Sequence, residues 1–169
     1  LTNAYRKASR ELIIEFALKT GMRITEALSI TWEQVDSDSR TVTVGESKTD
    51  AGTRRNIPLD ETLLGRLTAL RAEHYALQMQ YRDWNPTGLV FCTNMGNQNL
   101  LANLQIRVLT PLLKEAKLPH LTWHHLRHNA GSYLLSENVP ITAVSKILGH
   151  ANPAITMSIY AHELKEDFE

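Results

Sequence analysis

The sequence predicts an α+β fold, mainly α-helical with a small antiparallel β-sheet. Apolar residues recur at helical spacing along most of the chain, beginning with Leu12, Ile13, Phe16 and Ala17. The alternation typical of strands is clearest in one stretch, residues 41–44. The length of 169 residues suits one domain with a single core, and 43% apolar with 21% charged residues is typical of a globular protein.

The first part of the chain is predicted to hold two helices and a β-hairpin. The first helix ends at Gly21, and a short helix follows over residues 25–30. Residues 41–44 and 53–59 then form two strands that pair as a hairpin, because a loop rich in turn-forming residues separates them. Lys48 is expected near the tip of this hairpin.

The middle of the chain is predicted to hold a long helix, a short strand and a second, irregular helix. Asp60 is placed to cap the long helix, and residues 89–93 favour the short strand. Pro111 is expected to kink the second helix, because proline has no N–H for the helical hydrogen bond. The apolar positions of the two helices are Leu63, Leu67, Leu70 and Leu77, then Leu101, Leu104, Val108 and Leu112.

Three helices are predicted in the last third of the chain. The first opens at His124, Pro140 begins the second, and Gly149 ends the second. Residues 152–153, Asn-Pro, have the cap-then-first-position form that begins the third helix, which bears Tyr160. The residues expected to point inward from the first of these helices are Leu126, Ala130, Tyr133 and Leu134.

The charge distribution leaves nucleic acid open as a partner. The formal net charge of zero argues at first against it. Residues 161–169 hold one basic and four acidic residues, and without them 17 basic residues stand against 14 acidic ones. A DNA-binding interpretation therefore depends on where the charges lie.

Cysteine usage and hydropathy favour the cytoplasm. Cys92 lies in an apolar run and is predicted to be a buried structural thiol, and a single cysteine permits no internal disulfide. No run of ~18 apolar residues predicts a membrane span, and no signal peptide is visible. Leu1 in place of an initiator methionine indicates a fragment.

Five cationic or proton-handling side chains precede one candidate nucleophile. Guanidinium groups stay charged and match phosphate oxygens in pairs, and a phenol can attack phosphorus when a base and cationic neighbours assist it. This set of side chains is what phosphoryl transfer to a tyrosine without a metal needs. The six residues are Arg23, Lys48, His124, Arg127, His150 and Tyr160.

Four short motifs carry these residues in order. They are TGMRITEAL at 20–28, HHLRH at 124–128, LGH at 148–150 and IYAH at 159–162. Each is weak alone, but together, with Lys48 in a hairpin between the first two, they are highly specific. From residue 9 to 162 the chain resembles the tyrosine recombinase (phage integrase) family.

The resemblance and the chemistry together assign a role to each residue. Tyr160 is the nucleophile, and the resemblance implies that Lys48 is the general acid for the leaving 5′ oxygen. His124 accepts the tyrosine proton or contacts a phosphate oxygen. The phosphate-binding residues are Arg23, Arg127 and His150.

Four further residues are expected to support the site. Glu26 is expected to orient an arginine, and His128 to support packing. Arg54 and Arg55 are expected to contact flanking DNA phosphates or simply to face water. His125 departs from the family pattern, since many relatives carry an acidic residue there.

What the resemblance implies goes beyond the site. Residues 1–169 would be the C-terminal catalytic domain of a site-specific recombinase, with the fold of the DNA breaking-rejoining enzymes. The N-terminal core-binding domain of relatives would then be absent from this chain. Tyr160 would form a 3′-phosphotyrosyl-DNA intermediate and strand exchange would follow, with no cofactor, metal or ATP.

The resemblance also implies the partners and the setting. The partners would be double-stranded DNA attachment sites, accessory DNA-bending proteins and three further copies in a homo-tetramer on DNA, whereas the isolated domain would be a monomer. The setting would be the cytoplasm of a bacterial host of a phage, prophage or other mobile element, at the nucleoid when bound to DNA and without contact to membrane.

Three other functions fit parts of the sequence. His124 and His128 are four residues apart, as two zinc ligands on one helix face are, but the glutamate of an H-E-x-x-H site is missing. A DNA-binding module without chemistry would not need Tyr160. A type IB topoisomerase shares the same chemistry, but the compact motifs resemble the integrases.

Overall fold

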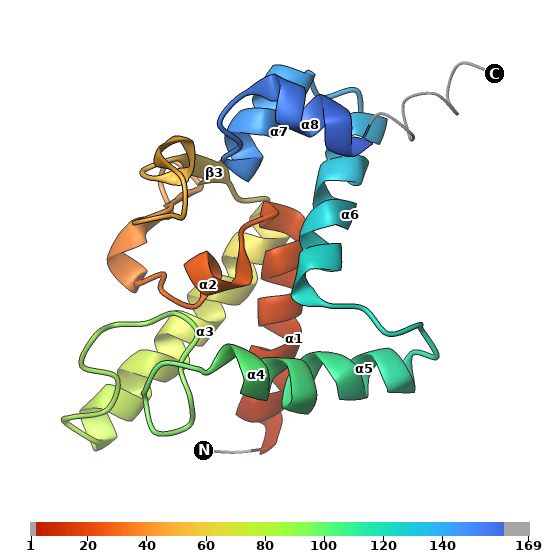
Figure 1. The fold of residues 1–169 in the computed structure, drawn as a ribbon. Helices are drawn as coiled ribbons and strands as arrows, with labels where there is room; N and C mark the ends of the chain where they lie inside the picture. The colour runs from red at the N-terminus through yellow and green to blue at the C-terminus, as the bar shows by residue number, and fades with distance from the viewer. Residues whose placement is uncertain (1–2, 161–169) are drawn as a thin grey trace.

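The computed structural model describes residues 3–160 (Figure 1). Helix α1 (Asn3–Thr20) packs against α3 (Glu61–Gln80) and α6 (Trp123–Ser136), and these three long helices frame the molecule. Phe16 and Ala17 of α1 lie in the main hydrophobic core with Leu63 and Leu67 of α3. The helical periodicity at the start of the sequence is thus the buried stripe of α1.

Gly21 ends α1 as predicted, and it does so at a crowded point. Its φ of +59° is in the left-handed region that favours glycine. A Cβ there would lie 2.7 Å from Leu148 Cδ2 and 3.3 Å from Ala130 Cβ. The end of α1 therefore meets α6 and α7 (Ile141–Leu148), and α2 (Ile24–Ala27) follows at once.

The predicted hairpin is confirmed, with one more strand than expected. Strands β1 (Val35–Asp36), β2 (Thr41–Thr43) and β3 (Asn56–Pro58) form an antiparallel sheet in the order β1-β2-β3. Val42 of β2 pairs with Val35 on one side and with Ile57 on the other. β1 follows the 3-10 turn η1 (Trp32–Gln34), and at two residues it is too short to show alternation. The β2–β3 loop contains a second 3-10 turn, η2 (Asp50–Gly52), and Lys48 lies just before it.

Residues 89–93 form no strand, contrary to the prediction. Isolated bridges join Leu89 to Thr31 and Cys92 to Gln98. The pairing with Thr31 stops after one bridge because the chain turns into η1 at Trp32. The capping prediction for α3 is confirmed, since Asp60 accepts a hydrogen bond of 2.8 Å from the Leu63 N–H.

The irregular helix consists of α4 (Leu101–Leu104), a π-helical stretch η3 (Gln105–Leu109) and α5 (Thr110–Glu115). The irregularity was predicted at Pro111, but the widened turn lies just before it. A π turn shifts the hydrogen-bond register, and proline can supply no N–H to the usual bond.

The last three helices begin within one residue of the predicted positions, α6 at Trp123 and α7 at Ile141. Gly149, with φ of +67°, follows α7, and Asn152 Oδ1 accepts a hydrogen bond from the Ile155 N–H at the start of α8 (Pro153–Tyr160). The prediction that Tyr133 points inward is wrong, because its exposed fraction is 63%. The buried stripe of α6 runs through Leu126 and Ala130, and Tyr133 lies off that stripe.

A buried hydrogen-bonded chain ties the start of α1 to α3. The Trp32 indole N–H donates to His74 Nδ1 at 3.1 Å, and Tyr5 Oη lies 3.0 Å from His74 Nε2. An indole nitrogen only donates, so Nδ1 accepts and the hydrogen of the neutral ring is on Nε2. Burial lowers the pKa of His74 to about 4. In residues 3–160 no helix is both long and apolar enough to cross a membrane.

His74 is expected to make the protein sensitive to acid. Its pKa is about 4 when folded and near 6.5 when unfolded, so the unfolded chain binds more protons between these values. Stability is therefore lost as pH falls through this window, by about 2 kcal/mol between pH 7.5 and 4.5. Urea unfolding at both pH values measures it, with His74→Gln as the comparison. An equal loss in the variant would contradict the assignment to His74.

Candidate active site

The C-terminal end of α7 is the junction on which the candidate site is built. The last carbonyls of a helix have no partner within the helix. Here the Ile147 carbonyl accepts from Arg55 Nε at 2.8 Å, the Leu148 carbonyl accepts from Arg127 Nη2, and the Gly149 carbonyl accepts from Thr49 Oγ1 at 3.0 Å. The three donors come from different segments: Thr49 from the β2–β3 loop, Arg55 from the residue before β3, and Arg127 from α6. They converge on the turn that carries His150.

Arg127 joins the ends of two helices. Its Nη1 donates to the Gly21 carbonyl at 2.7 Å, while Nη2 donates to Leu148. The residue is only 5% exposed. Burial and, after it, the charge of Arg23 lower the pKa of its guanidinium to about 10, so Arg127 remains protonated at neutral pH.

Glu26 links two arginines beside this junction. Arg23 Nη1 donates to Glu26 Oε1 at 2.9 Å, and Arg55 Nη2 donates to Glu26 Oε2 at 2.7 Å. The Ser47 hydroxyl adds a hydrogen bond of 2.5 Å to Oε1. Burial on its own would raise the pKa of Glu26, but hydrogen bonds from Arg55 and Ser47 outweigh it and hold the pKa at about 2. Glu26 is therefore an ionised, buried anchor for both guanidinium groups.

Arg54 and Arg55 lie in different surroundings. Arg54 is exposed, as expected of a residue that contacts phosphates or water. Arg55 is buried instead, with a side chain only 7% exposed. The sequence held a signal for this: Arg55, Ile57 and Leu59 alternate as the buried side of the strand segment, while Arg54 falls on the outer side.

Lys48 is held by the residues on either side of it. Ser47 is bonded to Glu26 and to Arg23, whose Nη1 lies 3.3 Å from the Ser47 hydroxyl oxygen, and Thr49 is bonded to Gly149. Lys48 itself is exposed. Its backbone is thus fixed next to Arg23 while its ammonium group is accessible.

The first turn of α6 separates two neighbouring histidines. His124 is exposed and lies three residues before Arg127, so the two are neighbours on the helix surface. His125 Nδ1 accepts from the Thr122 N–H at 3.1 Å and contacts the Thr122 hydroxyl at 2.7 Å. His125 thus completes the capping box that glutamate or glutamine usually completes. This gives the departure from the family pattern a structural role.

His150 lies in a field of positive charge. Its Nδ1 is 2.8 Å from the Thr156 hydroxyl of α8. Burial, and after it the charges of Arg127, Arg23 and Arg55, together lower the pKa of His150 to about 4. Three guanidinium groups therefore act on one imidazole, which is neutral at pH 7. An anion placed there would be stabilised by the same charges.

Tyr160, the last residue of α8, is buried against α6 and α7 and is only 2% exposed. It packs with Val144 and Leu148, and its ring centroid lies 4.8 Å from that of His128. A Cβ built on Gly131 would lie 2.0 Å from Tyr160 Oη, so the hydroxyl rests directly on the α6 backbone. The structure thus brings Arg23, Arg127 and His150 together, exposes Lys48 and His124 near them, and covers the candidate nucleophile.

Gly131 is expected to be essential for this position of Tyr160. An alanine usually stabilises a helix interior by about 1 kcal/mol over glycine. Gly131→Ala is expected instead to lower the free energy of unfolding by about 2 kcal/mol, because its Cβ overlaps the hydroxyl. Gly65→Ala in α3 is the matched control, since nothing lies within 4 Å of its Cβ. Equal effects of the two substitutions on urea unfolding would contradict the packing.

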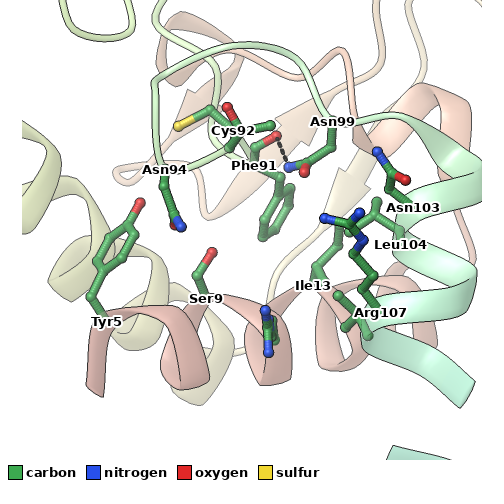
Figure 2. Close-up of a pocket in the computed structure, with 13 residues that line it drawn as sticks. Tyr5, Ser9, Ile13, Phe91, Cys92, Asn94, Asn99, Asn103, Leu104 and Arg107 are labelled. Atoms are coloured by element: carbon green, nitrogen blue, oxygen red, sulfur yellow. Dashed lines mark hydrogen bonds between the residues drawn. The ribbon is translucent and has the colours of Figure 1, made fainter. Parts of the chain in front are cut away.

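A separate hollow lies away from this site. Figure 2 shows it between α1, the loop at 91–99 and the α4–η3 segment. Its volume is about 200 Å³. Its lining includes Ser9 and Arg107, and Asn99 donates to the Phe91 carbonyl at its edge. Ser9 lies eleven residues before Thr20, about 16 Å along the helix. The hollow contains none of the predicted site residues.

A metal site gains no further support from the geometry. Within residues 3–160, no three histidine, cysteine, aspartate or glutamate side chains are grouped so that they could hold a metal ion. Cys92 is a buried free thiol, as predicted, and burial raises its pKa to about 11.

Comparisons of sequence agree with the arrangement of these residues. The model of the phage integrase family matches residues 1–167. Tyrosine recombinase XerC of Bacillus subtilis (strain 168) is 30% identical, over 92% of this chain and 50% of its own length. A XerC-like tyrosine recombinase of Caldanaerobacter subterraneus subsp. tengcongensis is 26% identical, over 86% of this chain and 44% of its own. The chain spans about half the length of these curated relatives.

Solved structures have the same fold. XerH site-specific recombinase, in a pre-cleavage complex with difH substrate, matches with a TM-score of 0.77 and 25% identity, over 99% of this chain and 46% of its own. XerA recombinase matches with a TM-score of 0.72 and 22% identity, over 99% of this chain and 64% of its own. Because the family model covers nearly the whole sequence and its motifs meet around the end of α7, the chain belongs to the phage integrase family of tyrosine recombinases.

Proposed function

We propose that residues 1–169 form the catalytic domain of a site-specific tyrosine recombinase that cuts and rejoins double-stranded DNA through Tyr160. The observation that carries the proposal is the convergence of Arg23, Arg127 and His150 at the ends of α1 and α7. Such a cluster of fixed positive charge suits a phosphodiester whose non-bridging oxygens gain negative charge in the transition state.

The proposed cleavage step exchanges one bond to phosphorus and transfers two protons. Tyr160 Oη forms a bond to phosphorus while the bond from phosphorus to the 5′ oxygen breaks. His124 accepts the phenol proton, and Lys48 gives a proton to the leaving 5′ oxygen. Arg23, Arg127 and His150 hold the phosphate, with Glu26 orienting Arg23 and His128 packing beside the nucleophile.

The products are a 3′-phosphotyrosyl linkage and a free 5′ hydroxyl. The phosphotyrosyl bond retains the energy of the broken phosphodiester, so a 5′ hydroxyl from a second duplex can reverse the step on a new partner. The scheme therefore calls for neither a metal nor ATP.

The substrate and partners follow by analogy. Since XerH is described in complex with its difH substrate, double-stranded attachment sites are the substrate proposed here, with Arg54 on a flanking phosphate. A homo-tetramer on DNA, accessory DNA-bending proteins, a monomeric free domain and action in the bacterial cytoplasm complete the proposal.

The buried Tyr160 sets a condition on this chemistry. A hydroxyl that rests on Gly131 and is almost fully covered cannot reach a phosphate on DNA. Helix α8 must therefore shift, or Tyr160 must rotate out, when DNA binds. A suicide substrate, nicked so that the cut strand is lost, tests the function: the wild-type protein is expected to form an adduct that survives a denaturing gel. No adduct on any attachment sequence would overturn the proposal.

Lys48→Ala is expected to slow cleavage without changing the phosphate-binding residues Arg23, Arg127 and His150. A positioned general acid contributes roughly 10²–10⁴-fold to rate. A 5′-thio leaving group departs as a thiolate and needs no proton, so it is expected to restore the rate of the variant. Single-turnover rates on matched oxygen and sulfur substrates measure this. If sulfur gives no rescue, Lys48 only positions phosphate.

A further inference from the structure

The β2–β3 loop is fastened at three points to the rest of the site. Ser47 and Arg55 bind Glu26 after α1, while Thr49 and Arg55 bind the end of α7. Lys48 lies between Ser47 and Thr49, the first two of these three fastened residues along the chain. Because the loop is held on both sides of Lys48, the backbone of this lysine has a defined position.

Arg55 is the central tie because each of its three side-chain nitrogens has its own acceptor. Nε donates to the Ile147 carbonyl at 2.8 Å, Nη2 donates to Glu26 Oε2 at 2.7 Å, and Nη1 donates to the Gly52 carbonyl. These acceptors belong to α7, α2 and the loop itself. Only a guanidinium has donors that diverge in this way, since a lysine ammonium is a single point.

Close backbone packing supports the same contact. A Cβ on Gly149 would lie 2.7 Å from Gly52 Cα and 3.0 Å from Arg55 Nη1. A Cβ on Gly52 would lie 2.3 Å from Ser47 Oγ. The loop therefore rests on the turn before His150 with no room for a side chain between them.

We propose that Arg55 is a positioning residue for the reaction. Through Glu26, Gly52 and Ile147 it fixes the Lys48 loop against the turn that carries His150, so that the Lys48 ammonium addresses the phosphate held beside that turn. Thr49 is the second tie of this contact. The inference rests on the proposed function, because it takes Lys48 as the general acid.

A direct role of Arg55 on DNA does not fit its surroundings. Its side chain is buried and its donors face protein acceptors. A purely structural role would lower cleavage of every substrate alike. A positioning role acts through the proton from Lys48, so it is sensitive to the leaving group.

The experiment compares two variants with two matched controls on oxygen and 5′-thio suicide substrates. The variants are Arg55→Lys and Thr49→Val. Thr43→Val removes a hydroxyl of the same hairpin that bonds to Asn56, and Arg66→Lys alters an arginine that pairs with Glu11 and Glu15. Circular dichroism and urea unfolding verify the fold of each protein.

Arg55→Lys is expected to slow cleavage of the oxygen substrate by on the order of 100-fold, and Thr49→Val by about 10-fold, as parts of a general-acid effect. On the 5′-thio substrate, the cleavage rates of both variants are expected to lie within about 3-fold of the wild-type rate. Both controls are expected to cleave both substrates like wild type, since exposed pairs contribute little.

Equal losses on both substrates in a folded variant would overturn the positioning role, as would unchanged rates on the oxygen substrate. If Arg55→Lys fails to fold, Thr49→Val carries the test, because it removes one hydroxyl and leaves Glu26 paired. Absence of any adduct with wild-type protein is a different result: it overturns the proposed function, and the inference with it.

Discussion

Tyr160→Phe is expected to abolish the covalent protein–DNA adduct and to leave both the fold and DNA binding in place. The ring keeps its packing against His128, Val144 and Leu148, so the free energy of unfolding is expected to change by only about 1 kcal/mol. Only the hydroxyl that is proposed to attack phosphorus is lost. Adduct on a denaturing gel and retardation of the same DNA on a native gel measure the two effects separately.

Tyr133→Phe is the matched control for this substitution. Tyr133 is 63% exposed on α6, and its hydroxyl has no part in the proposed chemistry. The control is expected to form adduct at the wild-type rate. A Tyr160→Phe protein that still became linked to DNA would show that another residue is the nucleophile.

Arg127→Lys is expected to damage stability and catalysis together. Arg127 donates from one nitrogen to the Gly21 carbonyl and from another to the Leu148 carbonyl, and both contacts are buried. A lysine can satisfy one of them at most, so the free energy of unfolding is expected to fall by about 3 kcal/mol. Loss of a preorganised donor to the phosphate is expected to slow adduct formation on the order of 10³-fold.

Urea unfolding and single-turnover cleavage measure these two effects. Because the variant keeps its charge, a phosphate-binding role that needed charge alone would leave the cleavage rate near that of the wild type. Such a result would contradict the guanidinium geometry. Arg66→Lys serves again as the control, since Arg66 pairs with glutamates on the surface of α1.

Much of the fold follows from residues that restrict the backbone. Gly21 and Gly149 end helices because both adopt positive φ, and Asp60 begins α3 because its carboxylate caps it. The hairpin follows from alternation in residues 41–44. Elements that depend on distant partners were not predictable: the bridge at residues 89–93 is limited by the turn at η1, and β1 needs β2 to be a strand at all.

In the candidate site, too, some features were predictable from the sequence and others were not. Motif order pointed to Arg23, Arg127 and His150, and the fold places them around one helix end. Which side chains face protein rather than solvent was harder to predict, because burial depends on the neighbouring element. Arg55 is buried by α7, and Tyr133 is exposed because no element within residues 3–160 covers that side of α6.

The convergence on α7 also restricts how this helix can change in length. Each residue inserted into a helix rotates everything after it by about 100° and advances it by about 1.5 Å. Since the carbonyls of residues 147–149 each meet a donor from a different segment, one inserted residue would aim all three away from their donors. Natural or engineered length variation between Pro140 and Gly149 is therefore expected only in whole helical turns, whereas the exposed turn at residues 137–138 can absorb single insertions.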